Sequence, residues 1–158
     1  MQAEIKVNSL NYFHSDVISS ISPPDTAIRN EYVFGIVGND RCNGYCERAS
    51  PGSVLFTIGA ETVGFLWITT STTISLNTWT SIMVKRTSGV YSLYINGISQ
   101  IINIDQGVDS NVIGNAALPV IIGLNFDGQI RNLFVNSILI GETYNNNYYI
   151  SITIISYL

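Results

Sequence analysis

Few residues of this chain are of the types that do chemistry, and they stand far apart. One histidine, His14, and two cysteines occur in 158 residues. No two carboxylates stand at positions i and i+2, so no strand can carry the close acid pair that glycoside hydrolysis uses. The sequence also contains no phosphate-binding loop, nucleophile elbow or dinucleotide fingerprint. We therefore expect no enzymatic activity.

The most unusual local feature is the pair Cys42 and Cys46, which lies in a polar, turn-rich stretch over residues 38–52. Three interpretations stay open. A disulfide between them would stiffen the tip of a loop and be worth about 2 kcal/mol in the loop-closure account. Two reduced thiols are expected if the protein is cytoplasmic. The pair could also be half of a zinc site, for which two further ligands are not evident.

Composition excludes several classes of partner. The net charge is -4, and of the seven basic residues only Lys85 and Arg86 are adjacent. Nucleic acid and anionic membrane surfaces need clustered Lys and Arg, so we expect neither as a partner. No apolar run approaches the roughly 20 residues of a spanning helix, so membrane insertion is not expected. The first residues show no secretory signal.

The elements that must position the polar residues are predicted to be strands. Alternating apolar residues flank Ser88-Gly89 and Asn96-Gly97, a pattern typical of hairpins. No sustained helical period occurs. The pattern predicts one all-β domain over residues 1–158, a two-sheet antiparallel β-sandwich. Strands are expected at 2–13, 27–37, 53–59, 62–70, 80–86, 90–95, 98–104, 118–125, 129–135, 138–141 and 148–158, and loops at 15–25, 38–52 and 105–117.

The apolar residues of the central strands should face the space between the sheets. This predicted core comprises Ile82, Val84, Leu93, Ile95, Ile122, Ile130 and Val135. We expect Trp79 to close the edge of the core. Gly97 and Gly128 should supply positive φ in turns.

Two segments of this region resemble a known family. Trp79-x-x-Ile82-x-Val84, followed by Leu93-Tyr94-Ile95-Asn96-Gly97, resembles a signature of the laminin-G-like, concanavalin A-like lectin/glucanase domains. The later Ile122-Gly123, Phe126-Asp127-Gly128-Gln129-Ile130 and Leu133-x-Val135 are similar to the end of that signature. The resemblance covers about residues 79–140. It implies a jelly roll whose curved sheet and edge loops often bind carbohydrate, sometimes with calcium. The Glu-x-Asp-x-Glu strand of the family's glucan-cleaving members is absent.

A calcium ion would require hard oxygen ligands at the rim of such a sandwich. Asn125 and Asp127 are the candidate ligands that we select. Asp127 is also explained more simply as the residue that starts a turn before Gly128.

The expected carbohydrate site centres on a tryptophan. If Leu66 and Ile68 face inward, Trp67 lies on the other face of its sheet, where its ring could stack on a sugar. The alternative is that Trp67 belongs to the core, as most large aromatic residues do. The candidate partners for sugar hydroxyls and stacking lie in the neighbouring loop and are Tyr45, Asp40, Arg41 and Asn43.

The C-terminal residues 144–158 form a β-prone run that is largely without charge and would aggregate as an exposed edge. It should pair with the first strand or dock on another protomer. The sequence thus predicts a non-catalytic recognition or adhesion module for a glycan or cell-surface polysaccharide. We expect it at the surface of a cell or virion, in a bacterial, viral or phage protein. The alternative is a structural subunit of a virion, tail or fibre.

Overall fold

The computed structural model describes residues 1–10, 14–20, 32–39, 49–60, 64–105, 120–145 and 150–152. Within these ranges the chain is all-β and contains no helix. The strands are β1 (Gln2–Val7), β2 (His14–Ser20), β3 (Tyr32–Val37), β4 (Ser53–Ala60), β5 (Gly64–Thr73), β6 (Thr80–Thr87), β7 (Val90–Ile95), β8 (Ile98–Ser99), β9 (Ile102–Asp105), β10 (Val120–Ile122), β11 (Gly128–Val135), β12 (Ile138–Asn145) and β13 (Ile150–Ile152).

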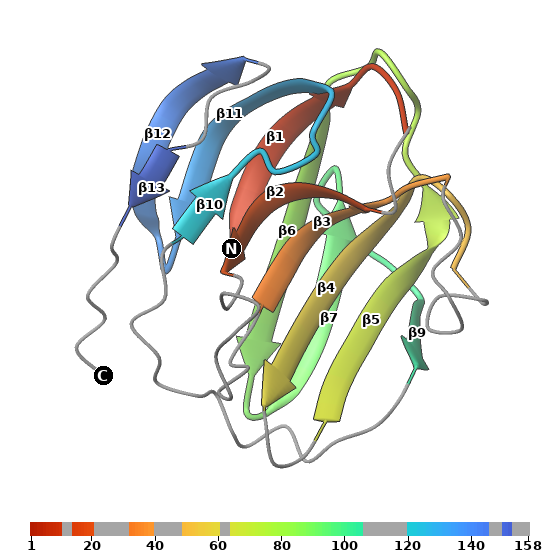
Figure 1. Ribbon diagram of the computed structural model, residues 1–158. Helices are drawn as coiled ribbons and strands as arrows, with labels where there is room; N and C mark the ends of the chain where they lie inside the picture. The colour runs from red at the N-terminus through yellow and green to blue at the C-terminus, as the bar shows by residue number, and fades with distance from the viewer. Residues whose placement is uncertain are drawn as a thin grey trace.

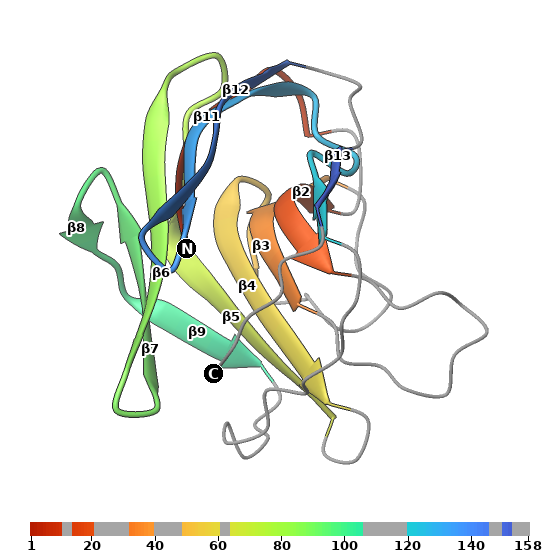
Figure 2. The same cartoon turned by 90° about the vertical axis from the view of Figure 1, so that its left-hand side faces the viewer.

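These strands form two sheets. One has six strands in the order β12-β11-β1-β6-β7-β8, and the other has seven in the order β13-β10-β2-β3-β4-β5-β9. Figure 1 shows β2, β3, β4 and β5 side by side with β9 at one end, and Figure 2 shows the two layers from the side. Each pair of neighbouring strands is antiparallel. The predicted two-sheet antiparallel sandwich is confirmed.

The order of pairing is nested. Strand β1 pairs with β11, and the next strand, β2, pairs with β10 in the other sheet. Between them the chain makes one meander, β3-β4-β5, in the seven-stranded sheet and another, β6-β7-β8, in the six-stranded sheet. This winding of the chain around two facing sheets is that of a jelly roll.

The core lies between the sheets, as expected from the alternation of apolar residues. Of the predicted core residues, six are at most 9% exposed, and Val135 packs against them while partly buried. The core also takes in Ile5 and Val7 from β1 and Phe34 and Ile36 from β3. Residues from both sheets therefore share one apolar layer, which is what holds the sandwich together.

Strand β2 corrects the prediction of a loop over residues 15–25. Residues 14–20 form a strand between β10 and β3. Its register shifts between Asp16 and Ile18, and both Val17 and Ile18 are fully buried in the core. The bulge places two successive side chains inward, so the strand lacks the period of two that marks a strand in the sequence. Residues 21–31 lie outside the described part of the chain.

The predicted strand over residues 98–104 is in fact two strands. β8 pairs with β7 in the six-stranded sheet, and β9 pairs with β5 in the seven-stranded sheet. The chain therefore crosses from one sheet to the other at Gln100 and Ile101. The C-terminal run also differs from expectation, because β13 pairs with β10 and not with the first strand. The first strand already has β11 and β6 as neighbours.

The two turn glycines have different roles. Asn96 and Gly97 have φ values of 51° and 77°, which fits a tight hairpin turn and confirms the prediction for Gly97. Gly128 is not among the residues with positive φ, so that prediction was wrong. It is needed for space, because a Cβ atom there would lie 2.1 Å from the backbone oxygen of Lys6.

Candidate functional site

Trp67 lies on the outer face of the seven-stranded sheet. Its neighbours Leu66 and Ile68 are buried in the main core, so the side chain of Trp67 points the other way. The indole is half-buried and packs against a second, small apolar cluster of Val33, Val37 and Leu55. The condition set by the sequence is therefore met for Trp67, which packs on this second cluster and not in the main core. Its role as a platform for a sugar stays a prediction.

Cross-strand pairing places Trp67 in a continuous row across this sheet. The row runs from Ser19 on β2 through Val33 and Thr57 to Trp67, and ends at Asp105 on β9. A second row on the same face comprises Asp16, Gly35, Leu55, Thr69 and Asn103. Apolar and polar residues thus alternate around the indole.

Both rows contain buried residues and also residues that are partly accessible near β9. Ser19, Thr57 and Thr69 are at most 4% exposed. At the β5 and β9 end, Trp67 and Asn103 are half-buried and Ser71 is exposed. Asn103 donates from Nδ2 to Oγ of Ser71 over 3.5 Å. Asn103 is the diagonal cross-strand neighbour of Trp67, a relationship that puts side chains about 7–8 Å apart. Asn103 therefore lies between Trp67 and Ser71 on this face, and Ser71 stands four residues further along β5 from the indole.

Several hydroxyl groups on the same face have no hydrogen-bond partner among the described residues. They are Oγ of Ser19, Oγ of Ser53 and Oγ1 of Thr69, and all three are buried. A buried hydroxyl without a partner is costly and is usually satisfied by an ordered water or a ligand. The outer face of this sheet therefore contains buried polar groups in addition to the apolar cluster.

The segment that holds the other predicted sugar-binding residues starts and ends beside the Trp67 cluster. Val37, at the end of β3, belongs to the cluster, and Ala49 packs against it. Between them, Asp40, Arg41, Asn43 and Tyr45 lie outside the described residues, as do Cys42 and Cys46. Their grouping with Trp67, and the three interpretations of the cysteine pair, stay predictions.

Asp127 has an evident structural task. Its carboxylate accepts hydrogen bonds from Oγ of Ser9 and, over 3.2 Å, from Nδ2 of Asn8, and its carbonyl oxygen accepts from the Asn8 amide. These bonds tie the end of β1 to the start of β11. Asn125 is exposed and adopts a positive φ of 56°. In the described residues no group of three His, Cys, Asp or Glu side chains could hold a metal ion. Asn125 and Asp127 alone do not make a calcium site, and we derive no function through calcium.

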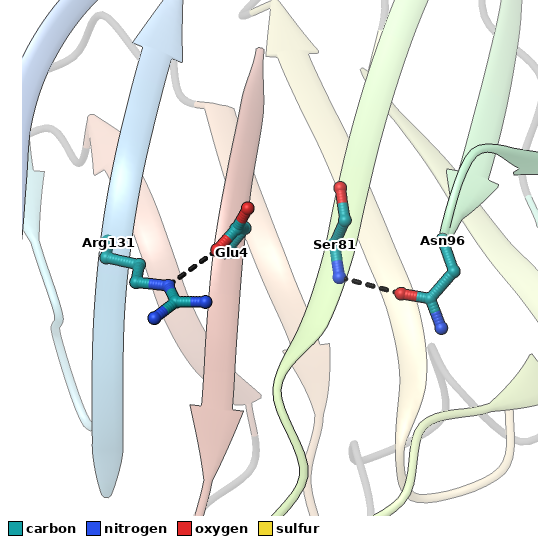
Figure 3. A network of polar contacts seen from close by, with 4 residues as sticks. All are labelled: Glu4, Ser81, Asn96 and Arg131. Carbon is teal, nitrogen blue, oxygen red and sulfur yellow. Dashed lines mark hydrogen bonds and ion pairs between the residues drawn. The ribbon is translucent and has the colours of Figure 1, made fainter.

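The outer face of the six-stranded sheet carries the other tryptophan. Arg131 on β11 pairs with Glu4 on β1 through Nε and Oε2, as Figure 3 shows. The guanidinium carbon of Arg131 lies 3.9 Å from the ring centre of Trp79. Trp79 is half-buried beneath this arginine and is not part of the main core. The expectation that it closes the core edge was wrong, because Trp79 precedes the inward-facing Thr80 and so points outward.

Asn103 and Ser71 were not among the candidate residues from the sequence. The signal for Asn103 was its polar side chain between Ile102 and Ile104, which marks the outer face of a strand. That signal did not show which sheet the strand joins. Only the crossing at Gln100 and Ile101 brings Asn103 beside β5 and Trp67.

Comparisons with known proteins found no match, whether among protein-family models, curated proteins or solved structures. The resemblance to laminin-G-like and concanavalin A-like domains therefore stays a prediction. None of the described residues belongs to a helix long and apolar enough to cross a membrane.

Proposed function

We propose that this protein is a carbohydrate-binding module without catalytic activity, and that it binds its ligand at Trp67 on the outer face of the seven-stranded sheet. The observation that carries the proposal is the position of the partly buried indole on the outer face of the sheet, with Asn103 as its diagonal cross-strand neighbour. Trp67 is held by Val33, Val37 and Leu55 beneath it, so its orientation is fixed before a ligand arrives. A fixed ring loses little entropy on binding.

The chemistry of this face suits an uncharged, hydroxyl-rich ligand. The indole offers an apolar surface for the C–H face of a sugar ring. Asn103 and Ser71 offer a carboxamide and a hydroxyl, which can both donate and accept hydrogen bonds. Lys85 and Arg86, the adjacent basic pair, lie on β6 in the other sheet. The proposed site thus contains no arginine or lysine among its described residues, which favours a neutral glycan over a phosphorylated or sulfated one.

The experiment that tests this function is a glycan-array screen, followed by titration of any binding glycan against the fluorescence of Trp67. The chain has two tryptophans, so Trp79→Phe leaves Trp67 as the single indole reporter. We expect specific, saturable binding by this variant with a change in its emission. Trp67→Phe should weaken binding at least tenfold, because the smaller ring offers less surface for stacking.

Trp79→Phe is also the matched control, since both tryptophans are half-buried on an outer face and the two lie on opposite sheets. Equal loss of binding in both variants would contradict a site at Trp67. A blank array from folded protein would contradict carbohydrate binding itself. The screen should be repeated with added calcium, which separates a calcium-dependent site from the one proposed here.

The alternative of a structural subunit that docks through residues 144–158 has less support. Strand β13, within that run, is paired with β10 of its own chain.

A further inference from the structure

One edge of the seven-stranded sheet has little of the charge that normally guards an edge strand against pairing with another strand. Among the described strands, β9 is the outermost on that side. Its four residues, Ile102–Asp105, include no proline, and their one charged residue is Asp105 at the end of the strand. Ile101, which precedes the strand, is 79% exposed, and Ile104 is 55% exposed.

The direction of the backbone groups of β9 follows from one hydrogen bond. The Ser71 amide donates to the carbonyl oxygen of Ile101 over 3.0 Å. In an antiparallel pair the backbone groups of alternate residues point to the same side. Residues 101, 103 and 105 therefore face β5, while the N–H and C=O groups of Ile102 and Ile104 point away from the sheet. They form the open hydrogen-bonding edge.

We propose that this edge binds a second copy of the same chain, with β9 pairing antiparallel to β9 of the partner about a two-fold axis at Asn103. In that register Ile102 lies opposite Ile104 of the partner subunit, and both residues have outward-pointing backbone groups. Two such pairs form four backbone hydrogen bonds. The interface is isologous, so it closes at a dimer and does not continue into a fibre.

Charge and burial both favour a second copy of the chain as the partner of the β9 edge. Ile104 faces the inner side of its sheet, because its partner Ile68 is in the core, yet it is 55% exposed at the open edge. In the dimer it gains Ile102 of the partner subunit as a neighbour. The register sets Asp105 opposite Ile101 of the partner subunit, so the two acidic positions are not paired with each other. A chain of net charge -4 can associate with itself at low electrostatic cost only through such an uncharged surface.

The other described edges fit less well. Strand β8 has only two residues and β13 only three, and β12 carries Glu142 within its length. In β9 the one acidic residue, Asp105, stands at the end of the strand, and the register centred on Asn103 leaves Ile102 and Ile104 to form the backbone hydrogen bonds.

The test uses the mass of the intact chain in solution, measured by light scattering over a wide range of concentrations. We expect a dimer of twice the chain mass of 17.3 kDa. Ile101→Asp should give a monomer, because it sets a second acidic residue opposite Asp105 of the partner subunit. Ile101→Lys should keep the dimer, because it sets a basic residue opposite that acidic position. The matched control Ile138→Asp, at an isoleucine that is 65% exposed at the start of β12, should also stay dimeric.

A cysteine at the two-fold axis tests the register directly. Asn103 faces its own copy as a pair that is not hydrogen-bonded, where Cα atoms lie about 4.5 Å apart, within disulfide range. Oxidised Asn103→Cys should form a covalent dimer, and wild-type protein and Ser71→Cys should not. A monomer at all concentrations overturns the proposal. So does loss of the dimer in both Ile101 variants, or the absence of a cross-link in the Asn103→Cys variant.

The dimer would put both Trp67 faces on the same side of one continuous sheet, since the two-fold axis is perpendicular to it. The β9 strands of the two copies would lie between the two β5 strands that carry the indoles, so three strand spacings, about 14 Å, would separate the indoles across the strands. This consequence for glycan binding rests on the proposed function. The mass and cross-linking experiments do not, so either proposal can fail without the other.

Discussion

The guanidinium group of Arg131 lies over the ring of Trp79 while its Nε donates to the carboxylate of Glu4. Three segments that are far apart in the sequence meet here, since Glu4 is on β1, Trp79 precedes β6 and Arg131 is on β11. Figure 3 shows the pair of Arg131 and Glu4. The stack lies on the outer face of the six-stranded sheet and connects β1 with β11 and with the start of β6. The guanidinium group of Arg131 covers one face of the Trp79 ring.

The stack predicts a measurable coupling between Arg131 and Trp79. Both side chains of the ion pair are partly exposed, with Arg131 at 42% and Glu4 at 33%, so the pair itself should contribute less than about 1 kcal/mol. The cation–π contact should add about 0.5–1 kcal/mol. A double-mutant cycle of Arg131→Ala and Trp79→Leu, in which the second change removes the aromatic ring, should show coupling of that size in urea denaturation. Additive losses of stability would contradict the stacking.

Measurements of stability at different salt concentrations distinguish the contribution of the ion pair from that of the cation–π contact. The loss caused by Glu4→Gln should shrink at high ionic strength, because solvent screens an exposed ion pair. Arg131→Lys keeps the charge but lacks the flat guanidinium group, so it should lose most of the coupling to Trp79. These two variants serve as controls for each other.

The role of Gly128 predicts a contrast with Gly89. A Cβ atom at residue 128 would overlap the backbone oxygen of Lys6 on the neighbouring strand, so Gly128→Ala must push β1 and β11 apart. We expect it to lower the free energy of unfolding by roughly 2–3 kcal/mol. Gly89 has a φ of 83° and open space around it, so Gly89→Ala should cost only about 1 kcal/mol of backbone strain. Equal losses in denaturation experiments would contradict the steric role of Gly128.

Two tyrosines predict how stability changes in alkali. Burial raises the pKa of Tyr32, and burial also raises the pKa of Tyr91, where nearby Arg86 acts in the opposite direction. The folded state therefore holds these protons more tightly than the unfolded state, whose tyrosines titrate near pH 10. The resulting stabilisation is complete below about pH 10 and is lost as the pH rises through the folded pKa values.

Urea denaturation from pH 8 to above pH 10 measures this loss. The double variant Tyr32→Phe, Tyr91→Phe should lose less stability over that range than the wild type, because neither phenyl ring can ionise. An identical pH profile for the two proteins would show that these hydroxyls do not contribute. Comparison at pH 8 corrects for any change in packing against Phe56, whose ring centre lies 5.2 Å from that of Tyr91.

The local elements follow from short stretches of the sequence. Alternation in residues 80–95 placed Ile82, Val84, Leu93 and Ile95 on one face, and the Asn96-Gly97 pair fixed a hairpin turn, because a period of two and positive φ are properties of a short segment. The same logic placed Trp67 opposite Leu66 and Ile68. These features needed no knowledge of distant residues.

Only the tertiary structure decided which strands are neighbours. The strand β2 was not predicted, because its bulge breaks the alternation and because Ser15, Asp16 and Ser19 are polar. These three residues are buried in a strand that pairs with β3 and β10. Because the chain crosses between the sheets after β8, Asn103 lies in the same sheet as Trp67. Trp79 stacks with Arg131, which belongs to a distant segment of the chain. Each of these outcomes depends on pairing between segments far apart in the chain, which a local pattern does not record. The free energy of such pairing comes from burying both partners together, so neither sequence segment reveals it alone.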